Sequence, residues 1–213
     1  MSVVLLLAIS VAGCGSTGAS ITSSALAPTT ITTTSGTAPA TSVSETSTTA
    51  AVAPGAKTWS DGTYQVGTDI PAGLYKSTKV GDNASWQTAS DATGSADSII
   101  ANVGVTGQCY VEVSNGQYLT LSLLTIAPAD AVKSASVGSK NITDGTYLVG
   151  TDIAPGKYKG TVWGDRAYWQ IATSADGVPE HIVSNDIPFA PFDVEVTEGQ
   201  FLTIRGVSIS LAQ

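Results

Sequence analysis

The chain of 213 residues carries little charge, since Asp, Glu, Lys and Arg together make up 12% of it, about half the usual fraction. Gly, Ser, Thr and Ala take the place of the missing charged residues. The Leu-, Glu- and Lys-rich runs of long amphipathic helices are rare, which favours short strands joined by glycine-rich turns. The formal net charge is −8, and no basic stripe is present to neutralise phosphates. We therefore expect no nucleic-acid partner.

Residue patterns that mark catalytic or cofactor sites are also scarce. His181 is the one histidine, and the sequence contains no G-x-S-x-G elbow, P-loop or dinucleotide glycine pattern. Glu112 and Glu195 form a repeated pair of carboxylates, but each stands between two inward-facing valines and is expected to face solvent. The sequence therefore predicts no metal, no cofactor and no enzymatic activity, with an envelope hydrolase as the minor alternative.

The N-terminus has the features of an export signal. Its apolar run, residues 3–9, is too short for a hydrocarbon core, which needs about 20 residues, but it suits a signal peptide. The residues Val11-Ala12-Gly13-Cys14 resemble the lipobox of bacterial lipoproteins, in which the cysteine is joined to diacylglycerol and becomes the first residue of the mature chain. The resemblance implies a signal peptide over 1–13 and a lipidated (palmitate-type) Cys14. The alternative is an ordinary signal peptide with a chance cysteine.

This resemblance also sets the expected location and the state of the second cysteine. A lipidated Cys14 places the protein outside the cytoplasm, anchored to the outer face of the cell membrane, and two or more acyl chains anchor stably. Cys109 would then have no partner, so we expect no disulfide. The lipoprotein pattern includes Lys or Arg before the apolar run, whereas this sequence begins Met-Ser, so we expect translation to start farther upstream.

A low-complexity segment comes after Cys14. Residues 15–57 are rich in Ser and Thr, lack aromatic residues and carry Glu45 as the only charge before Lys57. Such a segment buries too little apolar surface to offset the entropy of ordering. We therefore predict that 14–57 comprise the lipidated cysteine and a disordered tether, which is either a plain spacer or a glycosylated stalk.

The remaining sequence contains one passage twice. DGTYQVGTDIPAGLY begins at Asp61 and DGTYLVGTDIAPGKY begins at Asp144, and a shift of 83 residues aligns both passages, and the residues after them, without a gap. The same shift places VEVSNGQYLT (111–120) on VEVTEGQFLT (194–203). Two copies are too few for a solenoid, so each is expected to be nearly self-sufficient. Packing of one copy against the other would add buried surface to these small units.

Each copy is predicted to be all-β. Segments such as GTYQVG and GLYKST flank TDIPA, whose Pro and Gly suit a tight turn. Val111, Val113 and Leu119 alternate with polar residues, as half-buried strands do. About six strands per copy predict two tandem small β-sandwich or jelly-roll-like domains. We place the first domain at 58–126, a linker at 127–140 and the second domain at 141–213.

Residues retained in both copies are predicted to be structural. Asp69 and Asp152 precede Ile in the repeated turn, where a carboxylate accepts backbone N–H bonds. The alternative, calcium binding, lacks the closely spaced oxygen ligands of a calcium loop. Trp86 and Trp169 are expected in the two cores, and Cys109, which corresponds to Phe192, is expected to be a small core residue.

The repeated pattern, DG-x-Y-x-V-G-T-D-I-x-x-G-x-Y, resembles a module of secreted proteins and lipoproteins of actinobacteria and some Firmicutes. The resemblance covers both copies and implies an extracellular β-module, without an activity. Members of that family often carry Cys-Tyr-Trp and a later Gly-Cys-Gly that could form a disulfide. This chain has Ala167-Tyr168-Trp169 and Arg205-Gly206-Val207 there, so that bridge is absent.

Four residues of VWGDRAYW are the candidate ligand-binding site. Trp163 and Tyr168 replace Val80 and Ser85 of the first copy, so the fold shared by the two copies does not require them. Together with Asp165 and Arg166, on a predicted loop, they could bind a sugar ring or a peptide. The alternative is that they cover the junction of the two domains.

The predicted function is therefore display of two β-modules for binding or adhesion, with a cell-wall glycan or an envelope protein as partner. A purely structural scaffold that docks a partner is the alternative.

Overall fold

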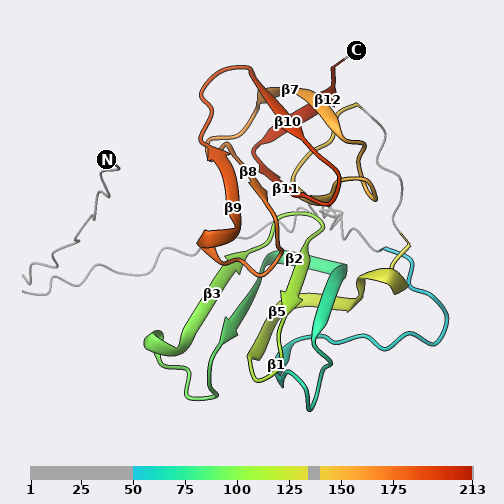
Figure 1. The fold of residues 1–213 in the computed structure, drawn as a ribbon, viewed down its shortest axis with the longest axis vertical. Helices are drawn as coiled ribbons and strands as arrows, with labels where there is room; N and C mark the ends of the chain where they lie inside the picture. Colours follow the sequence, from blue (N-terminus) through green and yellow to red (C-terminus); the bar gives the residue numbers. More distant parts are fainter. Residues whose placement is uncertain (1–49, 134–139, 213) are drawn as a thin grey trace, which may run out of the picture. The chain divides into compact units, whose positions relative to one another are not determined.

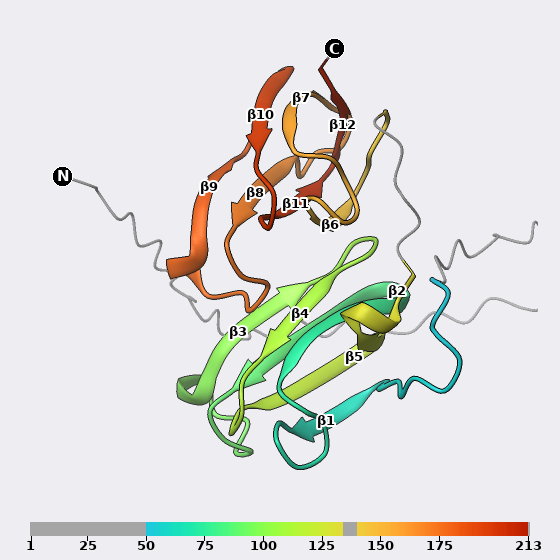
Figure 2. The same cartoon turned by 45° about the vertical axis from the view of Figure 1, so that its right-hand side comes forward.

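The computed structural model describes residues 50–133 and 140–212, which form two tandem all-β domains (Figures 1 and 2). The predicted all-β class and tandem arrangement are thus confirmed. The signal peptide, Cys14 and residues 15–49 of the predicted tether lie outside the described residues. Within the described segments, no helix is long and apolar enough to cross a membrane.

The first domain is built around two long strands. β2 and β5 pair antiparallel along most of their length, and the sheet order is β1-β5-β2-β3, with β4 paired to the first part of β2. The register of β2 against β5 shifts twice, which lets one long strand serve two differently oriented parts of the sheet. The elements are β1 (Gly62–Gln65), β2 (Gly73–Ala89), η1 (Ala96–Ser98), β3 (Ile99–Gly104), β4 (Tyr110–Val113), β5 (Tyr118–Pro128) and η2 (Ala129–Ala131).

The second domain divides the same plan into two separate sheets. Their orders are β6-β11-β8-β9 and β10-β7-β12, and both sheets contribute side chains to one buried core. The strands that correspond to β2 and β5 are each interrupted here, at residues 163–167 and at Gly206. The elements are β6 (Gly145–Leu148), β7 (Gly156–Val162), β8 (Tyr168–Ala172), η3 (Pro179–His181), β9 (Ile182–Asp186), β10 (Phe192–Val196), β11 (Phe201–Arg205) and β12 (Val207–Leu211).

Each domain has its own apolar core, filled by the alternating residues that the sequence predicts. Val111 and Leu119 are buried in the first core, and their repeat equivalents Val194 and Leu202 are buried in the second. Trp86 and Trp169 lie in the two cores, and Cys109 is buried in the first. These three core predictions are confirmed.

The repeated aspartates hold the repeated turns, as predicted. Asp69 Oδ2 accepts a hydrogen bond from the Gln65 amide (2.8 Å), and Asp152 Oδ2 accepts one from the Leu148 amide (2.9 Å). Gly67 adopts a φ of +97° in the first turn, a left-handed conformation that glycine tolerates better than other residues.

The first domain is longer at both ends than the predicted range 58–126. Val52 pairs with Val132, and the Ala53 amide donates to the Ala131 carbonyl (2.8 Å). The end of the predicted tether and the start of the predicted linker are therefore part of this domain. Ala- and Val-rich segments without charge patterning gave no sign of this pairing in the sequence.

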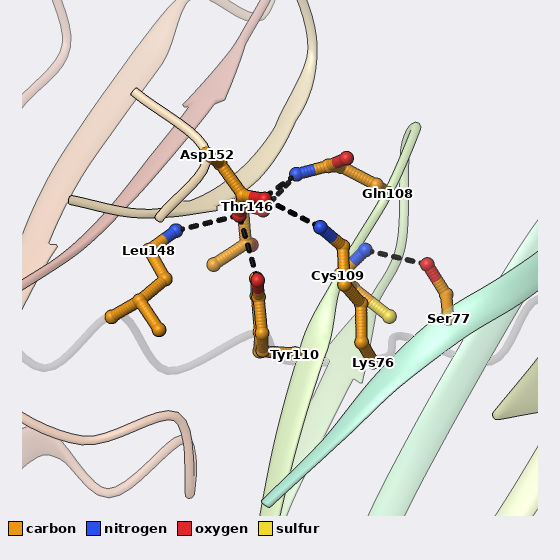
Figure 3. Close-up of polar contacts among 8 residues, drawn as sticks. All are labelled: Lys76, Ser77, Gln108, Cys109, Tyr110, Thr146, Leu148 and Asp152. Carbon is orange, nitrogen blue, oxygen red and sulfur yellow. Dashed lines mark hydrogen bonds and ion pairs between the residues drawn. The ribbon is translucent and has the colours of Figure 1, made fainter. Parts of the chain in front are cut away.

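A buried ion pair joins the two domains. Lys76 Nζ on β2 lies 2.5 Å from Asp152 Oδ1, with the side chains 2% and 0% exposed. The other carboxylate oxygen of Asp152 accepts hydrogen bonds from Tyr110 Oη (2.7 Å) and Gln108 Nε2 (3.3 Å) (Figure 3). The carboxylate that holds a turn in the second domain thus also receives three donors from the first.

Backbone hydrogen bonds extend this interface. The Thr146 amide donates to the Gln108 carbonyl (2.7 Å), and Gln108 Nε2 donates to the Thr146 carbonyl (3.0 Å). Tyr110 and Phe201, one from each domain, form an edge-to-face pair with ring centroids 5.4 Å apart. The two copies are therefore packed against each other as well as linked in sequence.

One of the two repeated glutamates departs from its prediction. Glu195 is exposed on β10, as expected, and lies 3.5 Å from Lys157. Glu112 is instead half-buried, and its carboxylate accepts a hydrogen bond from Ser174 Oγ (2.8 Å) of the second domain. The prediction that Glu112 is a solvated surface charge is wrong because the other domain covers that strand.

The repeat provides a matched test of the ion pair. Asp152→Asn removes the charge opposite buried Lys76 and should lower the free energy of unfolding by about 3–5 kcal/mol. Asp69→Asn changes the equivalent, exposed aspartate, whose carboxylate bonds only to its own turn, so we expect a loss of about 1 kcal/mol or less. Urea unfolding of the whole chain carrying Cys14→Ala, termed the non-acylated chain below, measures both losses. Equal losses in the two variants would show that the ion pair adds nothing to the stability that the turn hydrogen bond of the aspartate provides.

Candidate functional site

A cleft of about 190 Å³ opens between the two domains. Strands β2 and β3 and the segment 104–110 form its wall in the first domain. Strands β8 and β11 and the loop 173–177 form the opposite wall. The cleft therefore exists only when the domains are docked, and the contacts of the domain interface position it.

Aromatic side chains from both domains line the cleft. Trp86 and Tyr110 belong to the first domain, and Tyr168 and Phe201 belong to the second. Tyr168 is half-buried. Trp86 is buried in the core of the first domain, and Tyr110 and Phe201 are buried against each other across the domain boundary. Tyr168 therefore offers the most accessible ring of the four to a ligand.

Amide and hydroxyl groups stand between these rings. Tyr168 Oη donates to Gln170 Oε1 (2.7 Å) and accepts from Asn185 Nδ2 (3.3 Å). This leaves Gln170 Nε2 without a partner among the described residues. Gln108 Oε1 is likewise without one there, because Gln108 bonds to the interface through its nitrogen. One donor and one acceptor are thus available on residues that line the cleft.

Arg205 crosses the domain boundary at one end of the cleft. Its Nη2 donates to the Gly104 carbonyl (2.7 Å), and its Nε donates to Thr106 Oγ1 (3.4 Å). Arg205 also lines a second, more open depression of about 340 Å³ together with Arg166 and Asn83. Gly104, at the end of β3, and Thr106, just after it, therefore line both of these adjoining hollows.

The four predicted site residues do not form a single site. Trp163 and Asp165 lie on the loop between β7 and β8 and line neither hollow, and the Trp163 side chain is 63% exposed. Arg166 lines the depression, and Tyr168, the first residue of β8, lines the cleft. Asp165 and Arg166 lie in a turn, whereas Tyr168 begins β8, so the four residues do not share one regular element that would bring their side chains together.

No local sequence pattern marks the residues that complete the cleft. Gln108, Gln170 and Phe201 come from three separate segments, and no local motif joins them. Arg205 did give a sequence sign, because the first copy has Ser122 at the equivalent position. The difference between serine and arginine shows that the fold shared by the two copies does not require arginine at this position.

His181 lies away from the cleft lining. Its Nδ1 is 2.7 Å from Asp176 Oδ2, and this hydrogen bond and the negative charge of Asp176 raise the pKa of His181 above its ordinary value. Ser174, the nearby hydroxyl in sequence, donates to Glu112. Across residues 50–133 and 140–212, no three His, Cys, Asp or Glu side chains are grouped to hold a metal ion.

Cys109 lines the cleft but is not a candidate nucleophile. Burial raises the pKa of its thiol to about 12, against a weaker opposing effect of a hydrogen bond with Ser77. The reactive thiolate is therefore almost absent near neutral pH.

This gives a direct test on the non-acylated chain, in which Cys109 is the remaining cysteine. We expect no reaction of the native chain with a thiol-specific disulfide reagent at about pH 8, where an ordinary exposed cysteine reacts readily. Full reaction should follow in denaturant. A rapid reaction of the native chain would mean that the cleft admits the reagent to an ionised thiol.

Comparison with known proteins places this architecture in a family. The model of the Rv1352-like extracellular domain matches residues 56–119 and, a second time, residues 139–204. No curated protein and no solved structure matches the chain. The two matched ranges fall on the two tandem domains and together cover more than half of the sequence. The protein is therefore extracytoplasmic, and it belongs to the family of Rv1352-like extracellular domains.

Proposed function

We propose that this protein is a lipid-anchored protein of the cell envelope that binds a cell-wall glycan in the cleft between its two domains. The observation that carries the proposal is the cleft itself, with aromatic rings from both domains and available amide groups. The extracellular family supports the location. The proposed role is binding, and no catalytic role is assigned.

The size of the cleft favours a sugar unit over a folded partner. A volume of about 190 Å³ is smaller than the roughly 300–1,000 Å³ of pockets that enclose drug-sized ligands. A stable protein partner would need a contact area on the order of 1,000 Å² or more. A single ring with hydroxyl groups fits both the dimensions and the mixture of aromatic and amide groups.

Lipid anchoring rests on the sequence Val11-Ala12-Gly13-Cys14 and on the apolar run before it. An acyl chain contributes about 0.8 kcal/mol for each buried CH₂, and two chains anchor stably. The anchor would keep the two domains beside the glycan that they bind.

Docking of an envelope protein is the second candidate function, and one observation favours it. Val183, within β9, is 56% exposed. Ile187 and Phe189, which come after β9, are 59% and 93% exposed. Exposed apolar groups of this kind occur at protein interaction sites. The alternative that Trp163 and Tyr168 cover the domain junction is supported only for Tyr168, since Trp163 is exposed.

The anchor is tested by replacing each cysteine separately. Cys14→Ala should move the protein from the membrane fraction to the medium, because the acyl chains that hold it would be missing. Cys109→Ala, the matched control, should leave it on the membrane. Fractionation followed by immunodetection measures the distribution. Membrane association of the Cys14→Ala protein would contradict the lipoprotein proposal.

The binding site is tested by sedimentation of the non-acylated chain with purified cell wall. Tyr168→Ala removes a ring of the cleft and should weaken binding roughly three- to tenfold. Trp163 belongs to the same predicted site, but its ring lies outside the cleft, so Trp163→Ala should leave binding unchanged. Thermal unfolding of both variants provides the folding control.

The opposite pattern, with binding lost in Trp163→Ala and kept in Tyr168→Ala, would move the site to the exposed loop. If the unaltered chain does not sediment with any wall fraction, the glycan proposal is wrong. Crosslinking in intact cells would then test the surface around Phe189 as a protein-docking site.

A further inference from the structure

The two arginines of the sequence meet at one place. Arg166 and Arg205 both line the open depression beside the cleft. The depression and the cleft share Gly104, Val105, Thr106 and Arg205, so the two hollows adjoin each other. A ligand seated in the cleft therefore has a neighbouring surface that carries both guanidinium groups.

The charge around these hollows is opposite to that of the protein as a whole. The chain has 17 acidic residues and a net charge of −8, yet no Asp, Glu or Lys lines either hollow. Asp152, at the domain interface, is paired with Lys76, whereas Glu112 keeps its negative charge and accepts a hydrogen bond from Ser174 of the cleft lining. The end of the hollows that carries Arg166 and Arg205 is therefore the locally positive part, and it would concentrate an anion on this acidic protein.

Both guanidinium groups retain hydrogen-bond donors. A guanidinium has five N–H groups, and Arg205 uses its Nη2 and Nε for Gly104 and Thr106. Arg166 is exposed and has no hydrogen-bond partner among the described residues, and the ion pairs found there involve neither arginine. Arginine forks match carboxylate and phosphate oxygens, which can accept two parallel hydrogen bonds.

We infer that the ligand is an acidic glycan, with a sugar ring in the cleft and its carboxylate or phosphate held by Arg166 and Arg205. This inference rests on the proposed glycan binding and adds the charge of the ligand. Carboxylate and phosphate present the same chemistry to an arginine fork, and the experiment distinguishes them.

The probe is the acidic polysaccharide of the cell envelope, isolated by anion exchange, and the protein is the non-acylated chain. One portion of the polysaccharide is carboxyl-reduced, which converts acidic sugars to neutral ones with the same backbone. Another portion is dephosphorylated. We expect binding of the untreated material to be lost after one of these treatments, and the treatment that abolishes binding identifies the anionic group.

Variants locate the contact on the protein. Arg166→Gln removes an exposed cation that has no structural partner in the described residues, and it should weaken binding roughly two- to fivefold. Lys133→Gln, which removes an exposed cation that lines neither hollow, is the matched control and should bind as the unaltered chain does. Thermal unfolding of Arg166→Gln should be unchanged.

Three results would overturn the inference. If the carboxyl-reduced and dephosphorylated glycans bind as well as the untreated one, the cleft recognises neutral sugar, and glycan binding stands without the anionic group. The same conclusion holds if Arg166→Gln weakens binding no more than Lys133→Gln does. If no glycan fraction binds, treated or untreated, the proposed function fails together with the inference.

Discussion

The buried ion pair between Lys76 and Asp152 determines how the two domains are placed. Removing two charges from water is costly, and their mutual attraction offsets that only when the remaining hydrogen-bonding groups are also satisfied. Here Tyr110, Gln108 and the Leu148 amide bond to the same carboxylate. A docking that buried either charge without these partners would be costly, so the ion pair favours the arrangement observed. The cleft is a product of that arrangement.

The aspartate of this ion pair belongs to the turn that both copies share. Asp69 and Asp152 occupy the same turn and accept the same backbone bond, but only Asp152 meets a lysine of the other copy. The two cores also diverged in a coordinated way. Gly160 lies opposite Phe192, and a Cβ there would come within 2.2 Å of the ring. In the first copy, smaller Cys109 leaves room for Ser77, whose hydroxyl accepts a hydrogen bond from the Cys109 amide (2.9 Å).

Local patterns predicted the local structure, and contacts between the domains escaped them. Alternation of Val and Leu identified strands, and the repeat itself identified two domains, because each depends on residues close in sequence. Glu112 is half-buried because the other domain, with Ser174, covers it. The alternation of residues along a strand gives no information about such a contact. The surroundings of the four predicted site residues also depend on distant segments. Tyr168 and Arg166 contribute to hollows that are completed by distant segments, whereas Trp163, in the same short stretch, contributes to neither.

A site between two domains couples binding to docking. Arg205 illustrates this, since its guanidinium reaches the Gly104 carbonyl of the first domain while it lines both hollows. A ligand that contacts both walls binds only the docked state and therefore stabilises it by mass action. Conversely, the contacts that hold the domains together form the cleft before the ligand binds. Less conformational entropy is therefore lost on binding. At the boundary of a tandem repeat, both copies can contact a single ligand, and both arginines of this sequence, Arg166 and Arg205, lie in the second copy beside that boundary.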